Sequence, residues 1–241
     1  MFSSYKNKIA EWDWYDLKQV SSTNDSIKEL NKDKLPAVIS AKEQTGGRGR
    51  CGRKWYGLDG NLYFTFSLKI ARQELSRYVC IIGLSLAKTI KNIAPFIDVK
   101  IKWPNDIFLN DKKVTGILIE NIADDIWAVG IGVNIKASPE IKDMPYKATS
   151  LKENGITSER SVFLRQYLEQ LTLDIKEYQE QGFTYIREQW LQMALNLGKE
   201  VTIKNGDTEK TGQFLTLDEN GYLILKREDK EERIIAGDLF I

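Results

Sequence analysis

The sequence predicts an α+β fold, in which a large mixed α/β domain is followed by a small all-β module. Three observations support this prediction. Strand-like apolar runs recur through residues 14–135, an amphipathic helix is spaced over residues 73–94, and short β-prone runs separated by turns follow Gly198. The chain has 241 residues, which is enough to bury a sizeable core. We therefore expect two domains, residues 1–195 and residues 196–241.

Composition excludes several classes of protein. The formal net charge is only +1, so a generally basic surface for nucleic acid is not expected. The most apolar run, residues 79–87, is too short to span a bilayer, and the N-terminus lacks the apolar segment of a signal peptide. Two cysteines are too few for a disulfide framework, which fits a reducing cytoplasm. Because there is no histidine, Ser-His-Asp chemistry, Cys-His chemistry and His-ligated metals are excluded.

The N-terminal elements follow from composition and spacing. Ser21 to Asn24 offer N-cap chemistry for a helix that runs to about residue 31. Apolar residues at three- and four-residue steps predict the helix over residues 73–94. Asn110 to Lys112 read as the turn of a hairpin. The segments with strand composition are residues 14–20, 37–42, 61–70, 99–109, 114–121 and 126–135.

The C-terminal elements begin as helices and end as strands. Residues 136–160 lose all periodicity and form a long excursion. A helix is predicted over residues 163–181, and a shorter one over residues 183–195 after Gly182. The β-prone runs beyond Gly198 alternate with Asn-Gly and Asp-Lys turns, a pattern typical of a small β-barrel.

The most unusual stretch is residues 43–55, EQTGGRGRCGRKW, called here the basic loop. Its glycines and arginines alternate: Gly47, Arg48, Gly49, Arg50, Gly52 and Arg53. Glycine allows close backbone approach, and the planar fork of arginine fits phosphate and carboxylate oxygens. We therefore expect the loop to fold over an anion, with a merely solvated basic loop as the alternative. The glycines match G-x-G-x-x-G, but the β-prone strand that follows excludes a Rossmann site, and the P-loop motif is absent.

Polar residues interrupt two of the expected strands. In KWPND, Pro104 removes a ladder hydrogen bond, so Asn105 and Asp106 are placed at a break in the strand; a simple β-bulge is the alternative. Lys113 begins the next strand near one end of the sheet, where it could equally be a solvated turn lysine. Gly130 and Gly132 point to the same face of their strand, which leaves a bare patch where a ring could lie against the backbone.

Together these segments closely resemble the biotin–protein ligase family. The matching stretches are Ser22-Thr23-Asn24, Gln44 with GGRGRCGRKW, KWPNDIFLNDKKVTGILIE and GIGVNI, in the order that the family has them. The resemblance covers essentially the whole chain. It implies a mixed-sheet catalytic domain of the class II synthetase type with a C-terminal SH3-like β-barrel. It also implies the single-function form, without an N-terminal DNA-binding domain.

The resemblance implies a role for each residue that the motifs contain. The biotin-binding residues would be Ser22, Thr23, Gln44, Gly47, Arg48, Gly116, Gly130 and Gly132. The ATP-binding residues would be Asn24, Arg50, Arg53, Trp55, Asn105, Lys113 and Asn134. Catalysis would rest on Lys113 at the acyl phosphate and on Arg48 and Arg50. Separately, because the chain has no histidine, Asp106 is the candidate for the acceptor of a proton. Cys51 stands where some relatives have arginine, and no metal ligands are assigned.

The implied reaction uses ATP with Mg²⁺ to convert biotin to biotinyl-AMP, and then transfers biotin to a lysine of a biotin carboxyl carrier protein, a subunit of acetyl-CoA carboxylase. We expect a cytoplasmic enzyme that binds neither DNA nor membrane, and a homodimer is left open. A lipoate–protein ligase or octanoyltransferase is the nearest alternative, although polar Thr23 and Gln44 favour a urea-bearing ring. A nucleic-acid binder is a further alternative, and the near-zero net charge argues against it.

Overall fold

The computed structural model describes residues 6–30, 35–140, 146–228 and 230–240. The chain forms two compact units, each built from two separate stretches. The first unit comprises Met1–Arg72 and Lys112–Glu169, and the second comprises Gln73–Asp111 and Gln170–Ile241.

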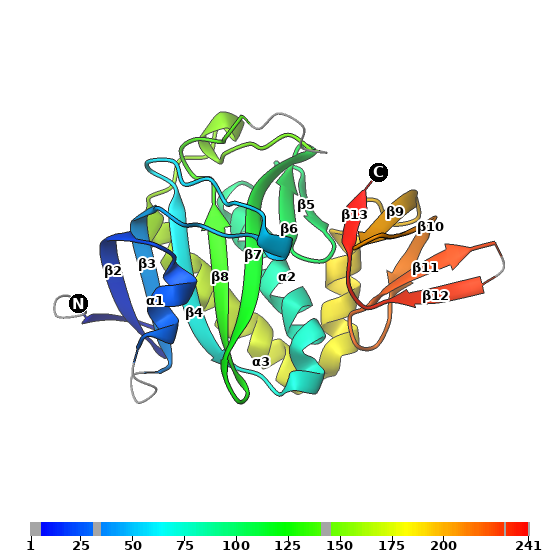
Figure 1. The fold of residues 1–241 in the computed structure, drawn as a ribbon, viewed down its shortest axis with the longest axis horizontal. Helices are drawn as coiled ribbons and strands as arrows, with labels where there is room; N and C mark the ends of the chain where they lie inside the picture. The colour runs from blue at the N-terminus through cyan, green and yellow to red at the C-terminus, as the bar shows by residue number, and fades with distance from the viewer. Residues whose placement is uncertain (1–5, 31–34, 141–145, 229, 241) are drawn as a thin grey trace. The chain divides into compact units, whose positions relative to one another are not determined.

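The first unit is organised around a mixed β-sheet (Figure 1). Its strands are β1 (Lys6–Ile9), β2 (Trp12–Val20), β3 (Ala37–Gln44), β4 (Leu62–Lys69), β7 (Lys112–Ala123) and β8 (Ile126–Val133). They lie in the order β1-β2-β3-β4-β8-β7, with β2 and β3 parallel and the other neighbours antiparallel. A parallel pair needs a crossover, which α1 (Thr23–Lys28) supplies. This helix packs on β3, β4 and β8.

The two faces of β4 serve different purposes, because side chains alternate along a strand. Phe64 and Phe66 face the core, where the Phe64 ring lies 5.5 Å from that of Tyr167 in α3 (Arg160–Gln192) and the Phe66 ring lies 5.7 Å from that of Trp12. Thr65 faces α1 and contacts Asn24. The antiparallel register places Gly130 opposite Thr65, so the glycines of β8 lie on the α1 face.

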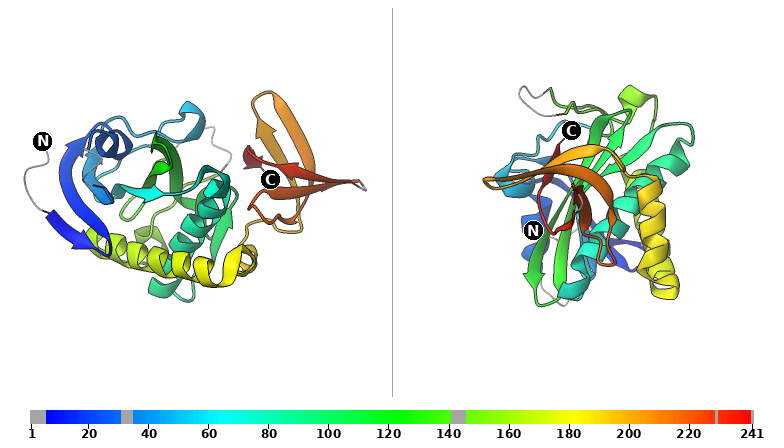
Figure 2. Two further views of the ribbon diagram at one scale, coloured as in Figure 1. Left: turned by 90° about the horizontal axis from the view of Figure 1, so that it is seen from below. Right: turned by 90° about the vertical axis from the view of Figure 1, so that its right-hand side faces the viewer.

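The second unit contains α2 (Leu75–Ile93), the hairpin β5 (Val99–Lys102) and β6 (Asp106–Leu109), and most of α3. Its C-terminal strands are β9 (Glu200–Asn205), β10 (Thr208–Leu217), β11 (Leu223–Arg227), β12 (Lys230–Ile234) and β13 (Asp238–Phe240). They form an antiparallel sheet in the order β12-β11-β10-β9-β13, in which β11 and β12 are a hairpin (Figure 2).

A buried polar cluster joins α2 to α3 within the second unit. The carboxylate of Asp174 is fully buried and accepts hydrogen bonds from Ser85 Oγ and Lys88 Nζ, both at 2.6 Å. The N-terminal turn of α2 also binds the C-terminal sheet, because Ser76 Oγ donates to Asn220 O at 2.6 Å. None of the helices described here is long and apolar enough to cross a membrane.

Most of the predicted elements are confirmed, with ends shifted by a few residues. Gly182 breaks α3 as expected, since its φ of 78° is non-helical. The helix expected to reach residue 31 has its C-cap at Glu29, and residue 31 lies outside the described residues. The expected turn at residues 229–230 likewise includes a residue outside them.

One predicted strand is wrong, and one strand was missed. The single strand over residues 99–109 is wrong: it is the hairpin of β5 and β6, in which Lys102 pairs with Asp106 across a turn that contains Pro104. Proline cannot donate to a ladder, so the strand stops there. Strand β1, with the sequence KNKI, was not predicted because it has little apolar character. The SH3-like C-terminal module is confirmed as an antiparallel sheet, in which the described residues show no pairing of β12 with β13.

Candidate active site

The start of α1 and the end of β3 meet at one point on the α1 face. The parallel register places Val20 beside Gln44, so the chain enters α1 next to the last residue of β3. Gln44 Oε1 accepts hydrogen bonds from the Thr23 N–H at 2.8 Å and from Thr23 Oγ1 at 3.0 Å. Ser22 is the N-cap residue and is buried, as Thr23 and Asn24 are. Thr65 Oγ1 donates to Asn24 Oδ1 at 2.6 Å and lies 2.8 Å from Thr23 Oγ1.

The bare patch that the glycines predict is present, and two side chains of the protein lie on it. Gly116 and Gly132 are direct cross-strand partners on β7 and β8. A Cβ atom at Gly132 would lie 2.4 Å from Cε2 of the Trp55 indole, and one at Gly116 would lie 3.0 Å from Cζ3 of the same ring. A Cβ atom at Gly130 would lie 2.1 Å from Asn24 Oδ1. Only glycine allows these approaches to the sheet backbone.

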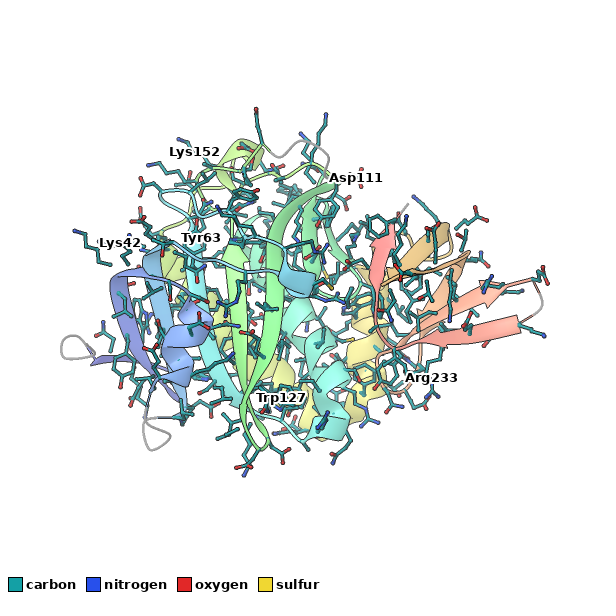
Figure 3. All side chains as sticks on the ribbon, viewed as in Figure 1. Lys42, Tyr63, Asp111, Trp127, Lys152 and Arg233 are labelled. Carbon is teal, nitrogen blue, oxygen red and sulfur yellow. The ribbon has the colours of Figure 1, made fainter. Side chains whose placement is uncertain are left out.

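The basic loop is closed by its own backbone. The Trp55 N–H donates to Gly47 O at 3.0 Å, and the Gly49 N–H donates to Arg53 O at 2.6 Å. The 3₁₀ turn η2 (Arg50–Gly52) forms the tip, where Cys51 is exposed with a φ of 54°. The basic loop is therefore a short hairpin, with an antiparallel bridge between Arg48 and Lys54. Beyond it, Tyr63 (Figure 3) fixes the chain, because its hydroxyl donates to Leu58 O at 2.8 Å.

Arg48 leaves this hairpin and forms a two-bond ion pair with an acidic residue of α1. Its guanidinium donates to Asp25 Oδ1 at 2.6 Å and to Asp25 Oδ2 at 2.7 Å, and lies 3.7 Å from Glu120 Oε2. The hydrogen bond from Arg48 lowers the pKa of Asp25, and the same bond raises the pKa of Arg48. Glu120 also accepts from Asn24 Nδ2 at 2.7 Å and lies 3.2 Å from Lys28 Nζ.

Lys113 lies near the start of β7, where the sequence placed it. Its Nζ atom is 5.5 Å from the centre of the Trp55 ring and 5.4 Å from the centre of the Tyr146 ring. It is also 3.5 Å from Tyr146 Oη. The first unit thus brings an amide, hydroxyls, bare backbone, an indole and two cations to one face of its sheet.

Comparison with known proteins decides the family. The model of the Biotin/lipoate A/B protein ligase family matches residues 17–135, and the model of the Biotin protein ligase C terminal domain matches residues 197–241. The chain is 34% identical, over 218 residues, to the biotin–[acetyl-CoA-carboxylase] ligase of Paracoccus denitrificans, with 85% of this chain and 90% of that protein covered. The chain belongs to the biotin protein ligase family. The family that the motifs indicated is confirmed.

Solved ligase structures match this ligase over nearly its whole length. Biotin protein ligase from Aquifex aeolicus in complex with biotin and ATP superimposes with a TM-score of 0.83 at 32% identity, covering 94% of this chain and 97% of that one. Biotin protein ligase from Leishmania major in complex with biotinyl-5-AMP gives a TM-score of 0.67 at 26% identity, covering 92% and 98%. The mixed-sheet fold with a C-terminal antiparallel module is that of these ligases.

Three of the residues expected to bind ATP or act in catalysis in this ligase need a separate description. Asn134 is buried, and its amide is used within the fold: it accepts from Asn61 Nδ2 at 3.3 Å and donates to Thr149 O at 3.1 Å. Asn105 and Asp106 belong to the second unit, where Asp106 is buried at the start of β6. How they approach the other site residues stays a prediction.

Several residues that the ligase brings to this site were not predicted. Asp25 and Glu120 neutralise Arg48, Thr65 orders the start of α1, and Tyr146 contacts Lys113. Thr65 gave a usable signal, since it is a polar residue within an apolar strand whose side chain alternates onto the glycine face. Among the described residues, no three His, Cys, Asp or Glu side chains gather in a way that could hold a metal ion.

Proposed function

We propose that this biotin protein ligase activates biotin with ATP, which gives biotinyl-5′-AMP and pyrophosphate, and then transfers biotin to a lysine of a biotin carboxyl carrier protein. The observation that carries the proposal is the meeting of the Thr23–Gln44 pair, the glycine patch and Lys113 on one face of the sheet. These are the groups needed for a polar ring, for close ring–backbone contact and for an anionic reacting centre.

Thr23, Gln44 and Ser22 bind the ureido ring of biotin. A urea presents both N–H donors and a carbonyl acceptor, and the amide of Gln44 together with the two hydroxyls can complement both. Thr23 and Gln44 are buried or half-buried and satisfy each other's hydrogen bonds, so they are held in place. The glycines at positions 47, 116, 130 and 132 carry no side chain, and at 116, 130 and 132 the ring of biotin would share the bare backbone with Trp55 and Asn24.

The first chemical step joins two anions, the biotin carboxylate and the α-phosphate of ATP. A carboxylate oxygen bonds to the α-phosphorus and pyrophosphate leaves. Arg48, Arg50 and Lys113 offset the repulsion, Arg53 stabilises the leaving pyrophosphate, and Trp55 stacks on adenine. Asn24, Asn105 and Asn134 complete the nucleotide contacts.

Mg²⁺ is proposed to arrive with the ATP phosphates, which together with water are its usual ligands in such enzymes. When bound, the ion would supply charge neutralisation at the phosphates.

In the second step the amine of the carrier lysine attacks the carbonyl carbon of the anhydride, and AMP leaves. A free lysine has a pKa of about 10.4, so roughly one amine in a few thousand is neutral at pH 7. Something must lower that pKa or take the proton, and with no histidine in the chain we assign the role of proton acceptor to Asp106.

The test is ATP–pyrophosphate exchange, measured without an acid, with biotin and with lipoate. Exchange that depends on biotin is expected, and exchange that depends on lipoate instead would identify a lipoate–protein ligase. Arg50→Ala should slow the biotin-dependent exchange roughly ten- to a hundredfold, because a charge-assisted hydrogen bond contributes about 1.5–3 kcal/mol. The control is Lys176→Ala, which removes an exposed lysine of α3 that pairs with Glu180 at 3.8 Å. This variant should show the wild-type rate of biotin-dependent exchange.

The remaining assignments belong with this function. Residues 1–195 hold biotin and ATP, and residues 196–241 are the C-terminal module. We assign the enzyme to the cytoplasm, in keeping with two cysteines that are both free. The acceptor is the carrier subunit of acetyl-CoA carboxylase, no DNA binding is expected, and a homodimer is compatible with the chain.

A further inference from the structure

The ammonium of Lys113 lies close to two aromatic rings and is 3.5 Å from the Tyr146 hydroxyl oxygen. Its Nζ atom is 5.5 Å from the centre of the Trp55 ring and 5.4 Å from the centre of the Tyr146 ring. Both distances lie within the range of about 6 Å over which a cation is attracted to the negative face of a ring. The two rings come from separate parts of the chain, the basic loop and the excursion before α3.

The main chain of Lys113 itself sets the position of Tyr146. The Lys113 N–H donates to Lys147 O at 2.9 Å, and Lys113 O accepts from the Thr149 N–H at 2.8 Å. These two bonds form a parallel bridge between Lys113 and Ala148. Tyr146 precedes this paired segment, so its ring is tied to the backbone of the residue whose side chain it contacts.

The end of the Lys113 side chain is confined on a further side. A Cβ atom at Gly116 would lie 3.3 Å from both Cε and Nζ of Lys113. The ammonium therefore rests against the bare backbone of β7 and the two rings. A lysine side chain has four flexible torsions, and contacts of this kind restrict the positions that its charge can take.

We propose that Tyr146 is a positioning residue for adenylation: its ring holds the Lys113 ammonium where negative charge develops at the acyl phosphate. The inference rests on the role proposed above for Lys113. Trp55 is already assigned to adenine, so a change at Trp55 would alter two functions. Tyr146 has no assigned contact with a substrate, and a change there acts through Lys113.

The first test compares Tyr146→Phe with Tyr146→Leu in biotin-dependent ATP–pyrophosphate exchange. Tyr146→Leu should lower kcat roughly three- to thirtyfold, the range of one cation–π contact, while the KM for biotin stays within about twofold. Tyr146→Phe keeps the ring and loses only the 3.5 Å contact between Lys113 Nζ and the hydroxyl, so it should retain a kcat within about threefold of wild type. Equal losses in both variants, or no loss in Tyr146→Leu, would overturn the proposal. Tyr222→Leu, which removes a ring 6.0 Å from Arg233 in the C-terminal sheet, is the control.

A double-mutant cycle separates positioning from general damage. Lys113→Met keeps the length of the side chain and removes its charge. In that background, Tyr146→Leu should cause no further loss of kcat, and a loss as large as in the wild-type background would overturn the proposal. Wild-type exchange by Lys113→Met alone would refute the role of Lys113, and this inference with it. A slow Lys113→Met with an unaffected Tyr146→Leu would refute this inference only.

A fluorinated series at position 146 covers the case in which Tyr146→Leu folds poorly. Each added ring fluorine weakens the negative potential of the ring and barely changes its size. The logarithm of kcat should therefore fall steadily from phenylalanine to its mono-, di- and trifluoro analogues at that position. A flat series would overturn the proposed attraction between the ring and the ammonium.

Discussion

A methyl group at Gly132 is the sharpest test of how Trp55 lies on the sheet. A Cβ atom at this position would lie 2.4, 2.5 and 2.6 Å from Cε2, Nε1 and Cζ2 of the indole. Carbon atoms in contact are about 3.5–4.0 Å apart, so the ring must move by about 1 Å or more. The backbone of Gly132 does not adopt positive φ, so alanine itself is tolerated there. The stability that Gly132→Ala loses is therefore lost entirely to overpacking against the indole.

Overpacking of this kind costs about 1–3 kcal/mol. For a chain of this size, the melting temperature should fall by about 2–4 °C for each kcal/mol, or about 2–12 °C in total. The moving indole also leaves Lys113, which lies 5.5 Å from it, so biotin-dependent exchange should slow as well. Thermal unfolding and exchange kinetics measure the two effects. Gly49→Ala is the matched control for stability, because its Cβ atom would lie 3.6 Å from the nearest atom.

The double variant Gly132→Ala/Trp55→Leu decides whether the indole is the cause. With the ring removed, Gly132→Ala should cost almost nothing relative to Trp55→Leu alone. A loss of stability that is equal in both backgrounds would show that the methyl group meets something else, and the described position of Trp55 over β8 would be refuted.

Three further predictions concern charge and burial. Asp25→Asn should lower the free energy of unfolding by about 0.2–1 kcal/mol near pH 7, since the ion pair with Arg48 is partly exposed. Because Arg48 lowers the pKa of Asp25 below 3.8, this difference from wild type should persist above that pH and shrink as the pH falls through the lowered pKa. Urea midpoints that differ equally at pH 7 and pH 3 would contradict this prediction. An aromatic disulfide reagent should modify exposed Cys51 in the native protein but Cys80 only after denaturation, because burial and the charge of Asp218 raise the pKa of Cys80 to about 12. Rapid reaction of both thiols in the native protein would contradict this prediction. Asp174→Ala should cost about 3 kcal/mol and lower the melting temperature by about 6–12 °C, since it removes the buried carboxylate to which Ser85 Oγ and Lys88 Nζ donate and leaves Lys88 only Glu177, at 3.5 Å. A fall below about 2 °C would refute this.

Local signals predicted most of the fold. Apolar spacing gave α2 and the two parts of α3, and β-branched runs gave the central strands. The prediction of a single strand over residues 99–109 was wrong because β-prone residues occur on both sides of the turn, whereas the hydrogen bonding divides the segment into two paired strands. Pro104 was recognised as an interruption, but composition does not tell whether a chain bulges or reverses at a proline. The register that pairs Lys102 with Asp106 depends on the turn geometry.

Some of the site residues could likewise be predicted from local sequence signals, and others could not. The glycine patch followed from alternation along one strand. The start of α1 was predicted from residues with N-cap chemistry, although Ser22 at the N-cap makes no side-chain capping hydrogen bond. Asp25 and Glu120 could not be connected to Arg48 from the sequence, because ion pairs between distant segments leave no periodic pattern. Tyr146 lies in the excursion without periodicity, so no sequence pattern placed it near Lys113. The bridge between Lys113 and Ala148, which forms on folding, brings them together.

The charges around Arg48 explain how the basic loop can fold before a substrate binds. Three arginines in an open loop would repel one another, but Arg48 already donates two short hydrogen bonds to Asp25 and lies 3.7 Å from Glu120. A substrate anion at Arg48 therefore exchanges with a carboxylate that uses the same donors. Replacing the Arg48–Asp25 ion pair with an ion pair between Arg48 and the substrate yields little net binding free energy, because the two ion pairs are similar in strength. We therefore expect Arg48 to contribute little to the affinity for biotin, which comes mainly from uncharged contacts such as those of Thr23 and Gln44, and to contribute mainly to the adenylation step.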